Sequence, residues 1–189
     1  MNARFDIRAT PLNGLSLLQR QRLGDERGYL ERMFCTEDLQ PLLQGRQIAQ
    51  INRTVTRKRG TVRGLHFQYH PYEEAKFVSC LGGEVFDVAV DLRRGSPTFL
   101  HWHAERLSAD NDKTLFIPEG FAHGFQALTD DCELLYFHTT HYAPQAEAGL
   151  HARDMRIGIA WPLRIAAQSP RDATHAMLDA DFAGIDVAS

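Results

Sequence analysis

The clearest pattern of apolar and polar positions lies in the middle of the chain. An apolar run at 77–81 leads through Gly82-Gly83 into a second run at 84–92, and two β-rich runs joined by Gly-Gly predict a tight hairpin. A turn at 93–98 leads into a further run at 99–103. Shorter runs bounded by Pro, Gly or Asp-Asp follow at 114–117, 124–128 and 133–138. Short strands with turn signals at this spacing predict an all-β sandwich or barrel rather than alternating β-α units.

The two flanks are less regular. A threonine followed by two acids predicts a short helix near 36–39, which Pro41 shortens or distorts. The last 46 or so residues form a return segment with a loose helical stretch around 171–181. We therefore expect a single domain over 1–189, with an N-terminal arm at about 1–48, a barrel core at about 49–143 and a C-terminal segment at about 144–189.

Composition agrees with one globular domain and excludes several classes. The 189 residues are 43% hydrophobic and 24% charged, near the averages for soluble domains, and the formal net charge of -3 gives no basic surplus for nucleic acid. No apolar stretch approaches the length of a membrane-spanning helix, and the N-terminus has no apolar signal core. Three widely spaced cysteines, Cys35, Cys80 and Cys132, predict reduced thiols in a cytosolic protein.

Two histidine-bearing segments are candidates for chemistry. His66 lies in a strand-like segment at 63–68, and His123 lies in the Pro- and Gly-punctuated turn at 117–125. Histidine is the side chain best suited to take and return protons near neutral pH. The structural alternative is a histidine hydrogen-bonded inside a β core. Lys76 has its own alternative, a surface lysine paired with Glu73 or Glu74.

The strand-like run at 84–92 has two acids on one face. Asp87 and Asp91 alternate with Phe86, Val88 and Val90. A carboxylate that points into a barrel is costly unless it is paired or hydrogen-bonded. If this face is interior, we expect polar partners for both acids; if it is exterior, they are ordinary solvated residues.

A metal site is a second hypothesis. His101 and His103 have the i,i+2 spacing that puts two imidazoles on one face of a strand, and His123 or Glu133 would have to supply a third ligand. Gln68 stands where a second ligand would be expected near His66. No Gly-rich dinucleotide or phosphate-loop signature is present, so any phosphate would have to be held by scattered arginines such as Arg27 and Arg63.

Several segments taken together resemble the dTDP-4-dehydrorhamnose 3,5-epimerase family of sugar-nucleotide epimerases. They occur in the family's order and spacing between about residues 20 and 180. They are GDERG at 24–28, RGLHFQ at 63–68, AKFV at 75–78, GEVFDVAVDLR at 83–93, SPT at 96–98, LS at 107–108, IPEGFAHGF at 117–125 and IAWP at 159–162.

The resemblance implies a mainly β, cupin-like jelly roll with short peripheral helices, normally a homodimer that binds its substrate inside the barrel. It also implies no metal and no redox cofactor. The implied reaction inverts C3, C5 or both in a dTDP-4-keto-6-deoxyhexose, by removing a proton next to the C4 ketone and returning one to the opposite face. The implied partner is therefore a nucleotide sugar.

The resemblance also implies residue roles. His66 matches the base, Asp172 its carboxylate partner, Lys76 the cation that faces the developing enolate, and Tyr136 the acid. Tyr142 matches the ring that stacks on thymine. The other positions that match those holding the nucleotide diphosphate and the sugar are Arg27, Glu31, Gln50, Asn52, Arg63, His123, Glu147 and Arg171.

The chain departs from the family pattern near the nucleotide and the acid. Ile51 replaces an acid between Gln50 and Asn52, His138 and His141 occupy the region after Tyr136, and Arg171 stands where lysine is usual. The catalytic four are retained. The alternatives left open are an epimerase acting at one carbon, one using a CDP- or GDP-linked sugar and, more distantly, a metal-dependent cupin enzyme or a binding module without catalysis.

Overall fold

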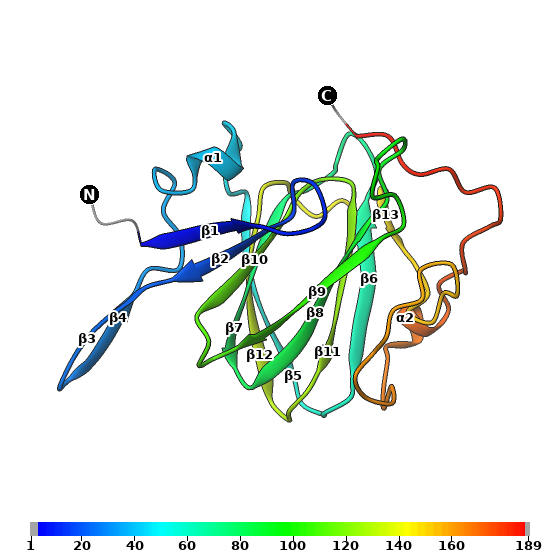
Figure 1. Cartoon of the computed structure of the whole chain (residues 1–189). Coiled ribbons are helices and arrows are strands. Elements are labelled where there is room, and N and C mark those ends of the chain that lie inside the picture. Colours follow the sequence, from blue (N-terminus) through cyan, green and yellow to red (C-terminus); the bar gives the residue numbers. More distant parts are fainter. Residues whose placement is uncertain (1–3, 188–189) are drawn as a thin grey trace.

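The computed structural model describes residues 4–187 and consists mainly of two antiparallel β-sheets that face each other (Figure 1). The larger sheet has six strands in the spatial order β1 (Phe5–Ala9), β2 (Ser16–Arg20), β10 (Lys113–Ile117), β7 (Lys76–Gly82), β12 (Cys132–His138) and β5 (Gln50–Thr56). The smaller sheet has five, in the order β13 (Glu147–Gly149), β6 (Val62–Gln68), β11 (Phe121–Ala127), β8 (Glu84–Asp91) and β9 (Trp102–Ser108). This arrangement confirms the expected jelly roll.

Three smaller elements complete the fold. Strands β3 (Arg22–Asp25) and β4 (Gly28–Glu31) form a separate two-stranded hairpin that extends away from the barrel (Figure 1). Helices α1 (Gln40–Leu43) and α2 (Pro170–Ala173) have one turn each. Within residues 4–187, no helix is long and apolar enough to cross a membrane. All three cysteines are free.

Strand alternation divides the apolar residues between the barrel interior and its outer faces. Val78, Leu134 and Phe125 belong to a cluster between the two sheets, while Phe77 and Phe137 pack on the outside of the larger sheet against the α1 region. The outer face of the smaller sheet is also covered, because Val88 and Val90 pack against the C-terminal segment. Both sheets are therefore buried on both faces over much of their area.

The two acids of β8 lie on its interior face and have polar partners. Asp91 accepts hydrogen bonds from Arg93, Ser96 and Thr98, so it fixes the turn that follows the strand. Asp87 bonds to a histidine of the neighbouring strand, described below. Both carboxylates are fully buried, and the interior interpretation of this face is confirmed.

The predicted Gly-Gly hairpin is wrong. Strand β7 pairs with β10 and β12 and β8 pairs with β11 and β9, so the chain passes from one sheet to the other at Gly83. Gly83 has φ of +70°, and a Cβ there would lie 2.4 Å from Thr129 Oγ1. The glycines do make a sharp corner. A turn signal cannot tell a chain that folds back from one that crosses to the facing sheet.

The helical predictions are also corrected. The first helix begins at Gln40 and not near residue 36, because Pro41 fits its first turn, where a missing N–H costs nothing. In the C-terminal segment only Pro170–Ala173 is helical, and 174–181 is irregular. Residues 99–100 are turn and His101 is irregular, so the strand expected at 99–103 begins at Trp102.

Candidate active site

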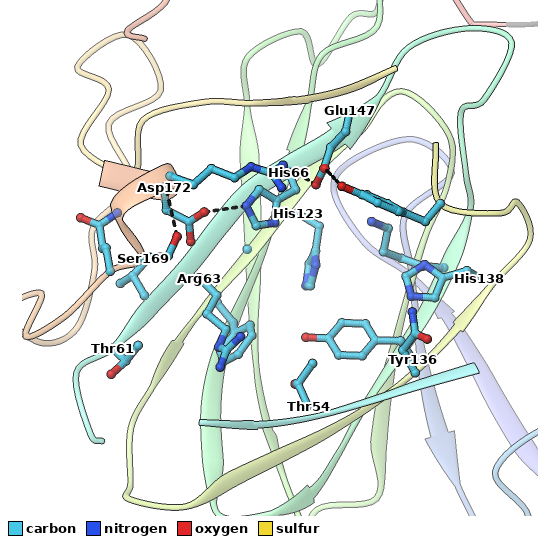
Figure 2. Close-up of a pocket in the computed structure, with 18 of the residues that line it drawn as sticks. Thr54, Thr61, Arg63, His66, His123, Tyr136, His138, Glu147, Ser169 and Asp172 are labelled. Atoms are coloured by element: carbon cyan, nitrogen blue, oxygen red, sulfur yellow. Dashed lines mark hydrogen bonds and ion pairs between the residues drawn. The ribbon is translucent and has the colours of Figure 1, made fainter. Parts of the chain in front are cut away.

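A cavity of about 610 Å³ lies between the sheets (Figure 2). Strands of both sheets contribute, and the C-terminal segment around α2 closes one side. Because side chains alternate along each strand, every second residue of β5 faces the cavity. The side chains that line it include Gln50, Asn52, Thr54, Arg63, His66, Glu74, Lys76, His123, Tyr136, His138, Tyr142, Glu147, Ser169, Arg171 and Asp172.

His66 of β6 is paired with a carboxylate from the C-terminal segment. Its Nε2 lies 2.8 Å from Asp172 Oδ1, while the other carboxylate oxygen accepts the backbone N–H of Gly64 at 3.1 Å. Burial raises the pKa of Asp172, but the hydrogen bonds from His66 and Gly64 outweigh it and hold that pKa below its usual value. Asp172 is therefore ionised, and it holds the imidazole of His66 at the Nε2 edge of the ring. The His66 side chain is 35% exposed.

A second imidazole–carboxylate pair lies beside the first. His123 of β11 is the direct cross-strand neighbour of His66, and its Nε2 lies 2.8 Å from Asp87 Oδ1. The side chains of His123 and Asp87 are 8% and 0% exposed. This pair connects two adjacent strands inside the barrel, so the core-histidine alternative describes His123 in part, although its ring also lines the cavity.

Lys76 of β7 enters the cavity from the facing sheet. It is buried, which excludes the surface-lysine alternative, yet its partner is the Glu74 that this alternative named: Nζ lies 2.6 Å from Glu74 Oε1. The other oxygen of Glu74 lies 2.8 Å from His138 Nδ1. Burial raises the pKa of Glu74, but the Lys76 ammonium and the His138 imidazole outweigh it and lower that pKa to about 2.

Tyr136 of β12 also faces the cavity from the larger sheet. Its ring lies edge-on to His123 with 6.0 Å between ring centroids, and it stacks on His138 at 5.7 Å. Burial, followed by the negative charge of Asp87, raises the pKa of the phenol well above its usual value. Tyr136 therefore stays protonated and suits the role of a proton donor.

The mouth of the cavity has a network of longer side chains. Tyr142 donates its hydroxyl to Glu147 at 2.5 Å, and Arg171 binds the other oxygen of Glu147 at 2.5 Å. Gln50 accepts the backbone N–H of Tyr142. The Tyr142 ring is 54% exposed, so one face is open to a planar group. Asn52 and Arg63 line the same cavity.

Two predicted binding residues lie elsewhere. Arg27 is at the tip of the β3–β4 hairpin, where it pairs with Asp25 at 2.5 Å and its side chain is 84% exposed. Glu31, at the base of that hairpin, binds the buried Arg20 at 2.7 Å. Neither lines the cavity of its own chain.

The metal hypothesis based on His101, His103 and His123 is not supported by the geometry. His103 Nε2 pairs with Glu105 at 3.1 Å, His101 lies in the turn before β9, and His123 is bound to Asp87. Gln68 bridges backbone groups, since its amide donates to Tyr72 and accepts from Ala143. In the described part of the chain, one cluster has three possible metal ligands close together, and it consists of His66, Asp172 and His175.

Sequence reasoning missed Glu74 as a cavity residue and gave His138 no role. The signal for both is strand alternation, because Glu74 is two residues before Lys76 and His138 is two residues after Tyr136. Ser169, the N-cap of α2, was also missed. Its Oγ accepts the backbone N–H of Asp172 at 3.0 Å and so helps to fix the start of that helix.

The cavity can support proton transfer from two sides. His66 lies on the smaller sheet and Tyr136 on the larger, and Figure 2 shows the two rings on different walls of the cavity. The buried ammonium of Lys76 adds a positive charge that can stabilise a developing oxyanion. The jelly roll with titratable side chains on facing walls of one cavity places the protein in the cupin-type class, with a cavity that can support proton transfer.

Comparison with known proteins identifies the family. The family model described as dTDP-4-dehydrorhamnose 3,5-epimerase matches residues 9–180, and the chain belongs to this family. The dTDP-4-dehydrorhamnose 3,5-epimerase of Shigella flexneri is 39% identical over 94% of this chain and 99% of its own. The dTDP-4-dehydrorhamnose 3-epimerase of Streptomyces niveus is 35% identical over 91% of this chain and 83% of its own.

A solved structure shows the same fold. The dTDP-6-deoxy-D-glucose-3,5-epimerase of Legionella pneumophila, crystallised with dTDP-4-keto-L-rhamnose, superposes with a TM-score of 0.89 at 36% identity. The match covers 97% of this chain and 100% of the other. The chain is therefore an isomerase of the sugar-nucleotide epimerase class.

Proposed function

We propose that this protein inverts C3 and C5 of a dTDP-4-keto-6-deoxyhexose without a cofactor. The observation that carries the proposal is the cavity with His66 on one sheet and Lys76 and Tyr136 on the other. A carbon next to a ketone loses its proton only when the resulting enolate is stabilised. Inversion further requires that the base and the acid approach opposite faces of the ring.

His66 is the proposed base. Because Asp172 is ionised and lies against Nε2, the neutral imidazole carries its proton at Nε2 and has a free lone pair at Nδ1. That lone pair accepts the proton from C3 or C5, and Asp172 stabilises the imidazolium that forms. A positioned base of this kind typically contributes about 10²–10⁴ in rate.

Lys76 and Tyr136 complete the proposed reaction. The Lys76 ammonium stabilises the enolate oxygen at C4, a contribution of typically about 10²–10³. The Tyr136 phenol then gives its proton to the carbon from the other face. His66 releases its proton to water and Tyr136 regains one from water, so the cycle is balanced.

The nucleotide is proposed to bind at the mouth of the cavity. The open face of Tyr142 suits thymine, while Arg63 and Arg171 have the guanidinium geometry that binds phosphate. His123, Gln50, Asn52 and Glu147 are proposed to hold the sugar and the nucleotide from the cavity wall. The family resemblance implies these roles, and the position of the residues on the cavity wall supports them.

We further propose that the protein is a homodimer in which the β3–β4 hairpin reaches the cavity of the second copy. Arg27 and Glu31 lie outside their own cavity, so a second copy is the route by which they would contact substrate. The hairpin also exposes Leu23, Tyr29 and Leu30, at 47%, 59% and 63%. Apolar side chains gathered on a protruding hairpin favour burial against a partner.

A mixing experiment tests this arrangement. Arg27→Ala and His66→Asn each inactivate a homodimer if both residues serve the site. When equal amounts of the two variants are mixed and allowed to exchange, half of the dimers are mixed and one of the two sites in each mixed dimer has both wild-type residues, so about a quarter of the activity should return. Activity that does not return on mixing, or a monomer in sedimentation, would contradict the proposal.

Isotope exchange tests the reaction. Incubation with dTDP-4-keto-6-deoxyglucose in deuterated buffer should place deuterium at both C3 and C5, and chelator-treated protein should do the same. Deuterium at one carbon alone would favour the single-carbon alternative, the activity of the Streptomyces niveus relative. No exchange with dTDP-, CDP- or GDP-linked ketosugars would refute the proposed function.

The cytosolic location expected from the three free cysteines stays a prediction.

A further inference from the structure

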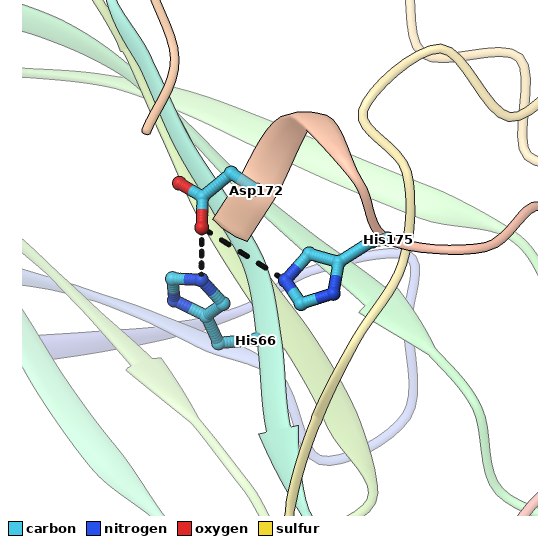
Figure 3. Close-up of side chains that lie close together, drawn as sticks. All are labelled: His66, Asp172 and His175. Atoms are coloured by element: carbon cyan, nitrogen blue, oxygen red, sulfur yellow. Dashed lines mark hydrogen bonds and ion pairs between the residues drawn. The ribbon is translucent and has the colours of Figure 1, made fainter. Parts of the chain in front are cut away.

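A second imidazole lies against the carboxylate of the His66–Asp172 pair (Figure 3). His175 follows α2 in the chain, and its Nε2 lies 3.8 Å from Asp172 Oδ1, the same oxygen that His66 Nε2 meets at 2.8 Å. The three ligand atoms all lie within 4.8 Å of one another. His175 does not line the cavity described above. It lies beside the carboxylate, and the mechanism proposed above does not use it.

His175 lacks a bonding partner at the atom that faces this cluster. Its Nε2 is buried and has no hydrogen-bond partner, because 3.8 Å is beyond hydrogen-bond range. Buried polar atoms in folded proteins are nearly always satisfied. An unsatisfied ring nitrogen beside a carboxylate and a second imidazole therefore points to a missing bonding partner between the three groups.

The position of the His175 ring depends on a glycine. A Cβ added to Gly149 of β13 would lie 2.2 Å from His175 Nε2 and 2.4 Å from its Cε1. Gly149 is also the cross-strand neighbour of His66. The absence of a side chain at residue 149 thus lets the second imidazole lie beside the first, and any larger residue would displace it.

We propose that His66 Nε2, Asp172 Oδ1 and His175 Nε2 form a binding site for a divalent transition metal ion that prefers imidazole, with Zn²⁺ as the probe. Zinc bonds to histidine and carboxylate at about 2.0–2.2 Å, which sets the ligand atoms about 3.4 Å apart in a tetrahedral site. The observed 2.8 and 3.8 Å lie on either side of this spacing. Water supplies the fourth ligand. Magnesium and calcium prefer oxygen ligands and bind poorly to such a site.

The bound ion inhibits the enzyme, and this part rests on the proposed function of His66. Zinc takes the lone pair of Nε2, so the one proton of the neutral imidazole moves to Nδ1 through solvent, with no net release. Nδ1 then has no lone pair with which to accept a proton from the sugar. The site acts as a reversible metal-dependent switch of the base, not as a cofactor site.

Zinc binding is measured first, without reference to activity. Chelator-stripped protein is titrated with ZnCl₂ against a chromophoric zinc chelator, with MgCl₂ as the comparison ion. Wild-type protein should bind one Zn²⁺ per chain, and His175→Asn and Gly149→Ala should each weaken binding at least tenfold. His103→Asn is the matched control, because it removes a partly buried histidine that is bonded to a different carboxylate. Its zinc affinity should equal that of wild type.

The activity arm separates this inference from the proposed function. Zinc should lower kcat of the wild type, a chelator should restore it, and His175→Asn should keep its basal activity while needing at least tenfold more zinc for the same inhibition. Binding that is absent, or equal in His175→Asn and His103→Asn, overturns the site. Thermal melts show whether Gly149→Ala is folded. If it is not, the zinc affinity of His175→Asn alone decides whether the site exists. If no ketosugar is turned over, the proposed function fails while the zinc titration still gives its answer.

Discussion

Two neighbouring histidine–carboxylate pairs share one hydrogen-bond length and differ in their surroundings. In both His66–Asp172 and His123–Asp87, the histidine Nε2 lies 2.8 Å from the aspartate Oδ1. The two histidines are cross-strand neighbours on β6 and β11. The first pair joins a strand to the C-terminal segment, and its imidazole is 35% exposed; the second joins two strands, and its members are 8% and 0% exposed. The partly exposed His66 imidazole is therefore the more accessible of the two to a substrate in the cavity, whereas the His123 imidazole is enclosed between two strands. The two pairs therefore differ in the exposure of their imidazoles and not in the length of their hydrogen bonds.

The largest effect is expected at the exposed imidazole. His66→Asn keeps a polar side chain near Asp172 but removes the base, so kcat should fall by about 10²–10⁴-fold. Binding of dTDP, measured by calorimetry, should stay within a few-fold of wild type. Wild-type turnover by the variant would show that the two pairs do not differ as described.

Replacing the two carboxylates should have its larger effect on stability in one case and on activity in the other. Asp87→Asn breaks a fully buried pair and should lower the free energy of unfolding by about 3–5 kcal/mol. Asp172→Asn should cost about 1 kcal/mol of stability, yet lower kcat by 10²-fold or more, because the tautomer of His66 is no longer fixed. Urea denaturation and steady-state kinetics on both variants make the comparison. Equal stability losses would contradict it.

A third carboxylate, Glu74, lies between Lys76 and His138 and adds a dependence on pH. The pKa of Glu74 is lowered from 4.5 to about 2, so its ionisation stabilises the fold above about pH 5 and this contribution is lost as the pH falls from about 4.5 to 2. Its size is on the order of 3 kcal/mol. Glu74→Gln should therefore be less stable than wild type at pH 7, and the difference should nearly vanish by pH 2. A difference in unfolding free energy that does not change with pH would exclude this contribution.

Much of the fold could be predicted from the chain because strand alternation is local. The segments around His66, Phe125 and Tyr136 are strands as expected, and the acids of β8 share one face, although the sequence left open whether that face is interior. The pairing of strands could not be predicted, since Gly83 makes the same sharp turn whether the chain folds back or crosses to the other sheet.

The roles of the candidate site residues were predicted from the family resemblance and not from strand alternation. The proposed catalytic side chains come together in one cavity, and the resemblance to a family named them. The position of Arg27 outside that cavity depends on where a hairpin lies in three dimensions, which no local pattern records. The approach of His175 to Asp172 depends on a glycine 26 residues earlier in the chain, and short-range reasoning does not connect two such positions.

If base and acid act from opposite walls of one cavity, Tyr136→Phe should separate proton exchange from inversion. This variant keeps His66 and Lys76 and removes the phenol proton. In deuterated buffer, mass spectrometry and NMR of the recovered dTDP-4-keto-6-deoxyhexose should show deuterium at the carbon that His66 deprotonates, with the original configuration retained and epimer formation reduced at least 10²-fold. Wild-type inversion by the variant, or complete loss of exchange together with inversion, would contradict the account.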